Sequence, residues 1–211
     1  MGRQILIAAT LLGGFAVLGS TLVGLTHDLT AERIQANERA ALLRSVNELV
    51  PADRYDNDLF NDTLEVRNRD MLGTGDPVTV FRARKGNLPV ALIFTPNAPD
   101  GYSGTIRLLV AIYADGNLAG VRVLNHRETP GLGDAIEVDR SDWITRFEGK
   151  NLDSPKEEQW KVKRDGGVFD QFTGATITPR AVVKAVHKAL LYFATEHERL
   201  FLAKSTATDP R

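Results

Sequence analysis

Thr173-Gly174-Ala175-Thr176 is the segment of this chain whose residue types best suit a covalent modification. A threonine hydroxyl is a weak nucleophile, so a threonine on a glycine-containing turn is modified by another protein more readily than it reacts alone. Thr178 is a good helix N-cap and Pro179 suits the first helical position, which predicts a helix directly after the turn. A phosphate ester on Thr176 would then lie at a helix N-terminus, where unpaired backbone N–H groups favour an anion.

Two further glycine-containing segments precede this turn. The first is Gly101-Tyr102-Ser103-Gly104, and the second is His126-Arg127-Glu128-Thr129-Pro130-Gly131-Leu132-Gly133. Each of them is also compatible with an ordinary turn between two elements. Glycines at these places would let the backbone approach a planar ring closely, and Leu132 would be suited to covering one face of such a ring.

Together with Asp170, the three segments resemble the signatures of the covalent-FMN subunits of the Rnf and Nqr respiratory complexes. In that family the flavin is joined through its phosphate to the last threonine of an Asp-x-x-Ser/Thr-Gly-Ala-Thr motif, and residues 170–176 match every fixed position. The resemblance extends from the N-terminal apolar segment to the last helix. It implies that Thr176 carries covalent FMN and that the other cofactor-binding residues are Asp170, Thr173, Gly174, Ala175, Tyr102, Glu128, Thr129, Gly131 and Leu132.

The resemblance also implies a function. This chain would relay electrons through FMN in a complex that couples electron transfer between NADH and ferredoxin to ion translocation, after a flavin transferase moves FMN from FAD onto the threonine. The other membrane subunits of that complex would be its partners. We expect no catalytic residues in this chain and assign structural or ring-positioning roles to His126 and Glu128, because a flavin that only passes electrons needs no substrate-directed acid or base.

The short chain resembles the G subunit of the Rnf type more than the longer C subunit of the Na⁺-pumping quinone reductase. That C subunit remains an alternative assignment. Two others are a non-redox periplasmic scaffold that lacks flavin and a stand-alone flavin reductase, although the sequence contains no separate substrate domain.

The N-terminus predicts a membrane anchor. Residues 5–25 carry no charge, and these about 21 residues suffice to cross a hydrocarbon layer about 30 Å thick. Arg3 precedes this segment while Asp28 and Glu32 follow it, which predicts a single pass of the inner membrane with the N-terminus in the cytoplasm. A cleaved signal peptide is disfavoured, since the apolar segment is long and Gly19-Ser20-Thr21 is no clear cleavage site. We therefore expect an anchor at 1–27, a periplasmic FMN-binding domain at 28–203 and a flexible tail at 204–211.

Composition narrows the remaining classes of function. The 211 residues include 26 Lys and Arg against 27 Asp and Glu, and this balance gives no indication of nucleic-acid binding. The absence of cysteine excludes disulfides, thiolate-bound iron–sulfur clusters and cysteine-ligated zinc in this chain. The four histidines are scattered, so no metal site is predicted.

Hydrophobic periodicity predicts an α+β domain with an antiparallel sheet and flanking helices. A second helix capped by Thr30 should run on from the membrane segment and end before Pro51, and a polar, irregular or weakly paired stretch should occupy 53–76. The expected strands are 78–83, 90–95, 105–114, 118–124 and 160–169, the last broken by Gly166-Gly167. A short helix is expected at 141–147, and the final helix should end near Leu202.

Overall fold

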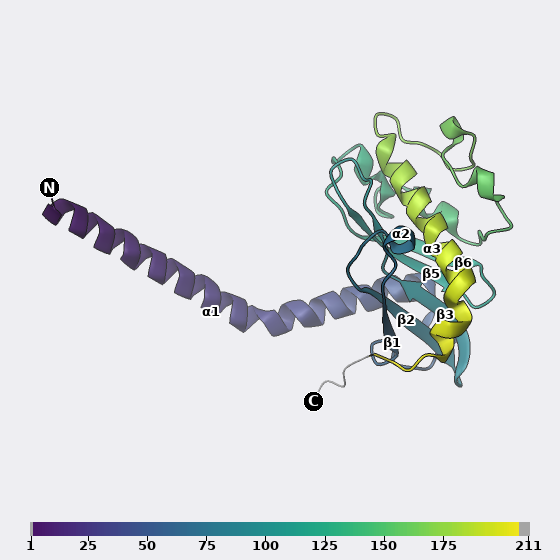
Figure 1. Ribbon diagram of the computed structural model, residues 1–211, viewed down its shortest axis with the longest axis horizontal. Helices are drawn as coiled ribbons and strands as arrows, with labels where there is room; N and C mark the ends of the chain where they lie inside the picture. The colour runs from purple at the N-terminus through teal and green to yellow at the C-terminus, as the bar shows by residue number, and fades with distance from the viewer. Residues whose placement is uncertain (1, 207–211) are drawn as a thin grey trace. The chain divides into compact units, whose positions relative to one another are not determined.

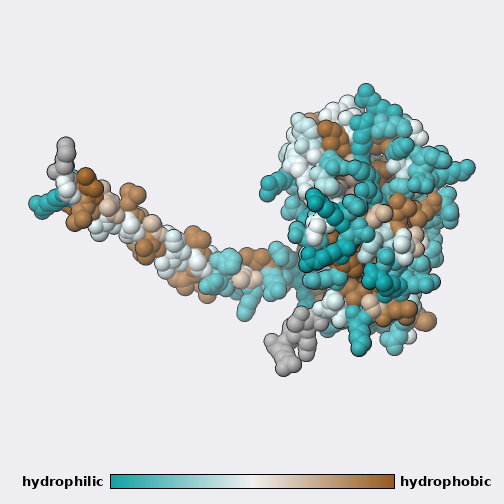
Figure 2. All heavy atoms as spheres, in the orientation of Figure 1, coloured by the Kyte–Doolittle hydropathy of each residue, from teal (hydrophilic) through white to brown (hydrophobic). Residues whose placement is uncertain are grey.

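The computed structural model describes residues 2–206 and divides the chain into two compact units, one up to Arg44 and one from Ser45. The first unit consists of most of α1, a continuous helix over Gly2–Leu49. Its initial part is long and apolar enough to cross a membrane, and apolar side chains cover it in Figure 2. The hydroxyl groups of Thr10 and Thr21 donate to the carbonyl oxygens four residues earlier, at 2.9 and 2.8 Å. These hydroxyls are therefore paired within the helix, as a hydrocarbon environment requires.

The prediction that Thr30 caps a second helix is wrong, but the expected continuation from the apolar segment is confirmed. The Thr30 hydroxyl donates to the carbonyl oxygen of Thr26 at 2.7 Å from within α1. The helix continues because no proline or glycine occurs between Leu25 and Val50, so nothing in that stretch interrupts the hydrogen-bond ladder. Its end before Pro51 is confirmed.

The second unit is built on a six-stranded antiparallel sheet in the order β1-β2-β3-β5-β4, with β6 also paired to β5 (Figure 1). The strands are β1 (Thr63–Val66), β2 (Val78–Lys85), β3 (Leu88–Phe94), β4 (Asn97–Ala98), β5 (Ile106–Tyr113) and β6 (Leu118–Asn125). The predicted strands between 78 and 124 are thus confirmed. Gly86 and Asn87 both adopt positive φ, 54° and 65°, which suits the two-residue turn between β2 and β3.

The polar stretch over 53–76 is largely irregular but contains three short elements. They are the 3-10 turn η1 (Ala52–Arg54), the strand β1 and the one-turn helix α2 (Arg69–Leu72). β1 forms because Leu64 and Val66 alternate toward the core and its backbone pairs with β2.

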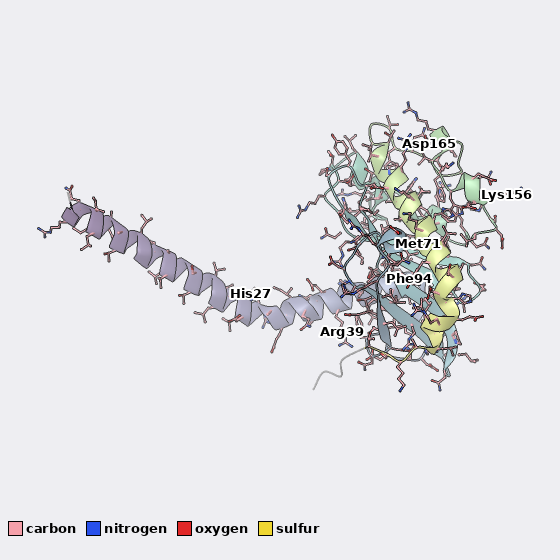
Figure 3. All side chains as sticks on the ribbon, viewed as in Figure 1. His27, Arg39, Met71, Phe94, Lys156 and Asp165 are labelled. Atoms are coloured by element: carbon pink, nitrogen blue, oxygen red, sulfur yellow. The ribbon has the colours of Figure 1, made fainter. Side chains whose placement is uncertain are left out.

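The last helix, α3 (Ile177–Leu202), covers one face of the sheet (Figure 1). Its Val182, Val186 and Leu190 are buried at helical spacing. Phe94, labelled in Figure 3, lies where α3 crosses β3, and its ring meets that of Tyr192 edge to face at 6.1 Å. This helix-on-sheet layer confirms the α+β prediction and sets the position of the N-terminal end of α3.

Between β6 and α3 the chain makes four 3-10 turns: η2 (Gly133–Ile136), η3 (Asp142–Phe147), η4 (Glu157–Gln159) and η5 (Lys163–Asp165). The predicted short helix at 141–147 is confirmed as η3, capped by the Ser141 hydroxyl, which accepts from the backbone N–H of Trp143 at 3.2 Å. The predicted strand at 160–169 is wrong, since only the single bridge between Val162 and Phe169 forms. Gly167 passes so close to the Lys161 carbonyl oxygen that an added Cβ would lie 1.9 Å from it, so the chain doubles back before a ladder can extend.

The end of α3 is held by two arginines of β2. Arg82, only 3% exposed, donates to the carbonyl oxygens of Leu200 and Ala203 and pairs with Asp62, while Arg84 donates to the Phe201 carbonyl oxygen. Just beyond the helix, the backbone N–H of Thr206 donates to the Thr63 carbonyl oxygen at 2.8 Å. The flexible tail was predicted over residues 204–211, of which 207–211 lie outside the described range.

Candidate functional site

The threonine segment forms a tight turn. Phe172 and Ala175 make an isolated antiparallel bridge with Thr173 and Gly174 between them, and Gly174 has a φ of +83°. A Cβ added to Gly174 would lie 3.2 Å from Cδ2 of Leu132. Glycine is therefore favoured here both by the left-handed backbone and by the close approach of the neighbouring loop.

The helix after the turn begins two residues earlier than predicted, at Ile177 in place of Pro179. Thr178 was expected to cap it, but its side chain is buried in the first turn and its hydroxyl donates to Oε2 of Glu128. The prediction was wrong because the helix has already begun at Ile177, which leaves Thr178 inside the first turn with its side chain directed to the buried carboxylate. Thr176 instead occupies the capping position, and its side chain makes no capping hydrogen bond in the described part of the chain.

Glu128 joins the three segments that the sequence singled out. Its side chain is buried, at 4% exposure, and Oε1 accepts the backbone N–H of Ser103 at 2.9 Å while Oε2 accepts the Thr178 hydroxyl. Cβ atoms added to Gly101 and Gly133 would lie 3.0 and 3.1 Å from its carboxylate oxygens. The two glycine segments thus close around this carboxylate, and the first turn of α3 is tied to both.

His126 orients the backbone beside Glu128. Its Nδ1 accepts the backbone N–H of Glu128 at 3.0 Å, so the ring proton is on Nε2, which lies 2.8 Å from Oε1 of Glu137. The structural role expected for His126 agrees with this geometry.

The three segments enclose a cavity of about 380 Å³, which falls in the range of about 300–1,000 Å³ usual for small-molecule sites. Predicted residues that line it are Tyr102, Glu128, Thr129, Leu132, Gly174, Ala175 and Thr176. Gly133, Ile177 and Thr178 also line it although the sequence analysis did not select them for binding. Gly133 lies within the second glycine segment and Thr178 lies just after the threonine turn, so their positions in the sequence could have identified them. The sequence analysis explains Gly133 by a turn and Thr178 by helix capping instead.

Large apolar side chains stand exposed at this cavity. Tyr102, Leu132 and Ile177 are 67%, 43% and 44% exposed, respectively. Such residues around a concavity are typical of a ligand site, because a planar apolar group would remove them from water. The exposed apolar side chains, the close backbone and the helix N-terminus together fit a planar ligand with an anionic end, as FMN is.

Asp170, Thr173 and Gly131 do not line the cavity. Asp170 lies on the outer side of the turn, where its carboxylate pairs with Nζ of Lys163 at 2.5 Å and its carbonyl oxygen accepts the indole N–H of Trp143 at 2.7 Å. The Trp143 ring also meets that of Phe172 edge to face at 5.1 Å. These contacts position the base of the turn and leave Asp170, at 54% exposure, within reach of another protein.

Comparison with known families defines the class of this protein. A family model for the FMN-binding domain matches residues 101–191, which include all three segments, and a model for the RnfG N-terminal region matches residues 1–49. The chain is thus an FMN-binding domain protein with an N-terminal helix of the RnfG type.

Full-length relatives narrow this class further. The chain is 44% identical to the G subunit of an ion-translocating oxidoreductase complex from Shewanella loihica, over 95% of this chain and 94% of the relative. It is 47% identical to the protein of that name from Pseudomonas aeruginosa, over 97% and 96% of the two chains, and 44% identical to that of Pseudoalteromonas atlantica, over 90% and 89%. This chain belongs to the family of G subunits of ion-translocating oxidoreductase complexes.

Proposed function

We propose that this chain relays electrons through FMN joined by a phosphoester to the hydroxyl of Thr176. The observation that carries the proposal is the position of Thr176. It lines the same cavity as residues of the two glycine segments, which lie 43 or more positions earlier in the chain. Its side chain makes no capping hydrogen bond among the described residues. The match to an FMN-binding domain over these segments supports FMN as the ligand.

The residues around the cavity suit such a cofactor. Tyr102 and Leu132 would cover the apolar ring system, and Gly174 would let the turn approach it. Glu128 is already bonded to Ser103 and Thr178, so its role would be to position the segments rather than to react. FMN, when bound, supplies the capacity to accept and release electrons one at a time.

Attachment would require a flavin transferase, because a threonine hydroxyl is weakly nucleophilic. The Thr176 oxygen would attack the FMN phosphorus of FAD, forming an O–P bond as the pyrophosphate bond breaks, with AMP leaving and the hydroxyl proton released to solvent. The backbone N–H groups at the start of α3 would favour the resulting phosphodiester anion. Asp170, exposed on the outer side of the turn, would serve transferase recognition or acceptor geometry.

We further propose the place of this chain in the cell. Residues 1–27 would anchor it in the inner membrane with Arg3 in the cytoplasm, and residues 28–203 would form the periplasmic FMN-binding domain. Its partners would be the other membrane subunits of an Rnf-type complex that couples electron transfer between NADH and ferredoxin to ion translocation. The relatives, each named as the G subunit of an ion-translocating complex, favour this assignment over the C subunit of the quinone reductase.

The test is intact mass and in-gel flavin fluorescence of the denatured full-length chain, expressed with and without a flavin transferase. We expect an FMN adduct only with the transferase, located by peptide mapping at Thr176. Thr176→Ala should abolish it and Thr176→Ser should retain part of it, whereas Thr173→Ala, which removes the other hydroxyl of the turn, should retain the adduct. An adduct of normal yield on Thr176→Ala would exclude the proposed linkage, and its absence from the wild type would favour the flavin-free scaffold. Turnover of a soluble electron acceptor without partner subunits would favour the stand-alone reductase.

A further inference from the structure

The 3-10 turn η5 is joined to the chain just before the threonine turn. We call residues 172–176 the acceptor turn. Nζ of Lys163, the first residue of η5, pairs with the Asp170 carboxylate at 2.5 Å. The backbone N–H of Arg164 donates to Oε1 of Gln171 at 3.2 Å. Two successive residues of η5 therefore hold the two residues that lead into the acceptor turn.

The third residue of η5, Asp165, is joined to the chain on the other side of the acceptor turn. Arg180, in the first turn of α3, donates through Nε and Nη2 to the two carboxylate oxygens of Asp165 at 2.6 and 2.7 Å, and Figure 3 labels Asp165 beside the beginning of this helix. Such a two-pronged contact fixes the relative orientation of the two groups. The hydrogen bond from Arg180 holds the pKa of Asp165 below its usual value, so the carboxylate is charged at neutral pH.

α3 is a rigid reference for these contacts, whereas the acceptor turn has few backbone bonds of its own. Val182 and Val186 bury one side of α3 in the core. Within the acceptor turn, the backbone N–H of Ala175 donates to the Phe172 carbonyl oxygen at 3.3 Å as part of an isolated bridge. A segment with so little ladder opens locally at a small cost in free energy. Contacts from outside the turn therefore contribute much of what holds Thr176 in place.

We propose that η5 holds the acceptor turn in the orientation from which Thr176 is modified, with Lys163 and Asp165 as positioning residues that act in series. Lys163 joins the acceptor turn to η5, and Asp165 joins η5 to Arg180 on the rigid helix. Breaking either pair disconnects the turn from α3. Neither Lys163 nor Asp165 lines the cavity at Thr176, so neither is placed to contact the flavin itself. The inference rests on the proposed attachment of FMN to Thr176.

The exposure of both ion pairs separates positioning from overall stability. The side chains of Arg180 and Asp165 are 42% and 36% exposed, and those of Lys163 and Asp170 are more exposed still. Ion pairs as exposed as these contribute little to the free energy of unfolding of a whole domain. Their loss should therefore leave global unfolding unchanged and act on the local opening of the acceptor turn.

The first test is the rate of transferase-dependent FMN loading, followed by intact mass over time on the full-length chain in detergent. Arg180→Met keeps the aliphatic stem and should slow loading about threefold to fivefold, the upper part of the range for an exposed ion pair. Arg180→Lys keeps the charge without the two-pronged geometry and should slow loading less. The matched control is Arg199→Met, which breaks the pair with Glu196 at the other end of α3 and should load at the wild-type rate.

Urea unfolding of the same variants gives the readout that separates the two roles. The midpoint for Arg180→Met should equal that of the wild type. Loading of Arg180→Met at the wild-type rate would overturn the inference. Slower loading together with a matching loss of global stability would also overturn it, because Arg180 would then support the fold and not the position of the turn.

The second test asks whether the two pairs act in series. Lys163→Met should slow loading by about the same factor as Arg180→Met, and the double variant should be no slower than about fivefold, since either change alone breaks the connection. Independent effects would multiply to about tenfold or more and would contradict the arrangement. Faster loading of Lys163→Met would also overturn it, because Lys163 would then compete with the transferase for Asp170.

Amide hydrogen exchange of the unloaded chain tests the inference without flavin. Arg180→Met and Lys163→Met should each raise the exchange rate of the peptide that contains residues 172–176 by about threefold to fivefold and leave that of β5 unchanged. Exchange of this peptide at the wild-type rate would overturn the inference whether or not Thr176 carries FMN. Absence of an adduct on the wild type, together with the expected change in exchange, would instead contradict the proposed attachment and support the role of η5 in holding the turn.

Discussion

Replacing Glu128 should show that one buried carboxylate assembles the flavin site. Glu128→Ala leaves the Ser103 backbone N–H and the Thr178 hydroxyl without their acceptor. Each unpaired buried group costs about 1–3 kcal/mol, so we expect a loss of about 2–6 kcal/mol. A domain of this size is stable by about 5–15 kcal/mol, so the loss would be a large part of the total. Glu128→Gln keeps the shape and one acceptor oxygen, and should cost about 1–2 kcal/mol.

The assay is urea unfolding of the full-length chain in detergent, followed by tryptophan fluorescence. Both tryptophans of the chain, Trp143 and Trp160, lie in the domain, so the signal reports its core. The expected order of stability is wild type, then Glu128→Gln, then Glu128→Ala, with transferase-dependent flavin loading falling in the same order. If Glu128→Ala unfolds at the same urea concentration as the wild type, with an unchanged slope, the carboxylate does not hold the segments together.

Three further changes test other parts of the structure. Gly174→Ala forces a Cβ onto a residue with φ of +83° beside Leu132, so it should cost about 1–2 kcal/mol and slow flavin loading, as measured by intact mass over time. Arg82→Ala removes one partner of Asp62 and the donors to the carbonyl oxygens at the end of α3, so the free energy of unfolding in urea should fall by about 3–5 kcal/mol. An unchanged free energy of unfolding would show that Arg82 does not hold the end of α3. Burial lowers the folded-state pKa of His187, so the unfolded chain binds its proton more readily. Stability should then fall as the pH drops below about 6.5 toward the folded-state pKa, and in thermal melts His187→Gln should reduce that dependence.

Local residue patterns were enough to predict most elements of this chain and the order of its motifs. The uncharged run of residues 5–25 predicts a membrane-spanning helix whatever its surroundings, because its composition and length suffice. The strands between 78 and 124 follow from alternation and turn residues, whose effect extends over only a few positions. The Thr-Gly-Ala-Thr turn was also recognisable, since the backbone of Gly174 needs no distant partner to favour glycine.

Other features depend on residues that are distant in the chain, and only the folded domain reveals them. Thr178 is a residue type that favours helix caps. In the folded domain its hydroxyl instead donates to the buried carboxylate of Glu128, which lies 50 positions earlier in the chain. Residues 160–169 have the residue types of a strand, but Gly167 packs on the Lys161 backbone and the aromatic rings gather beneath α3, so no ladder forms. In both cases a long-range contact outweighs a local preference, because local propensities are small beside the free energy of burying and pairing polar groups. Residue patterns alone therefore identify which segments exist and which threonine to examine, and the packing of those segments around Glu128 determines where the cavity lies.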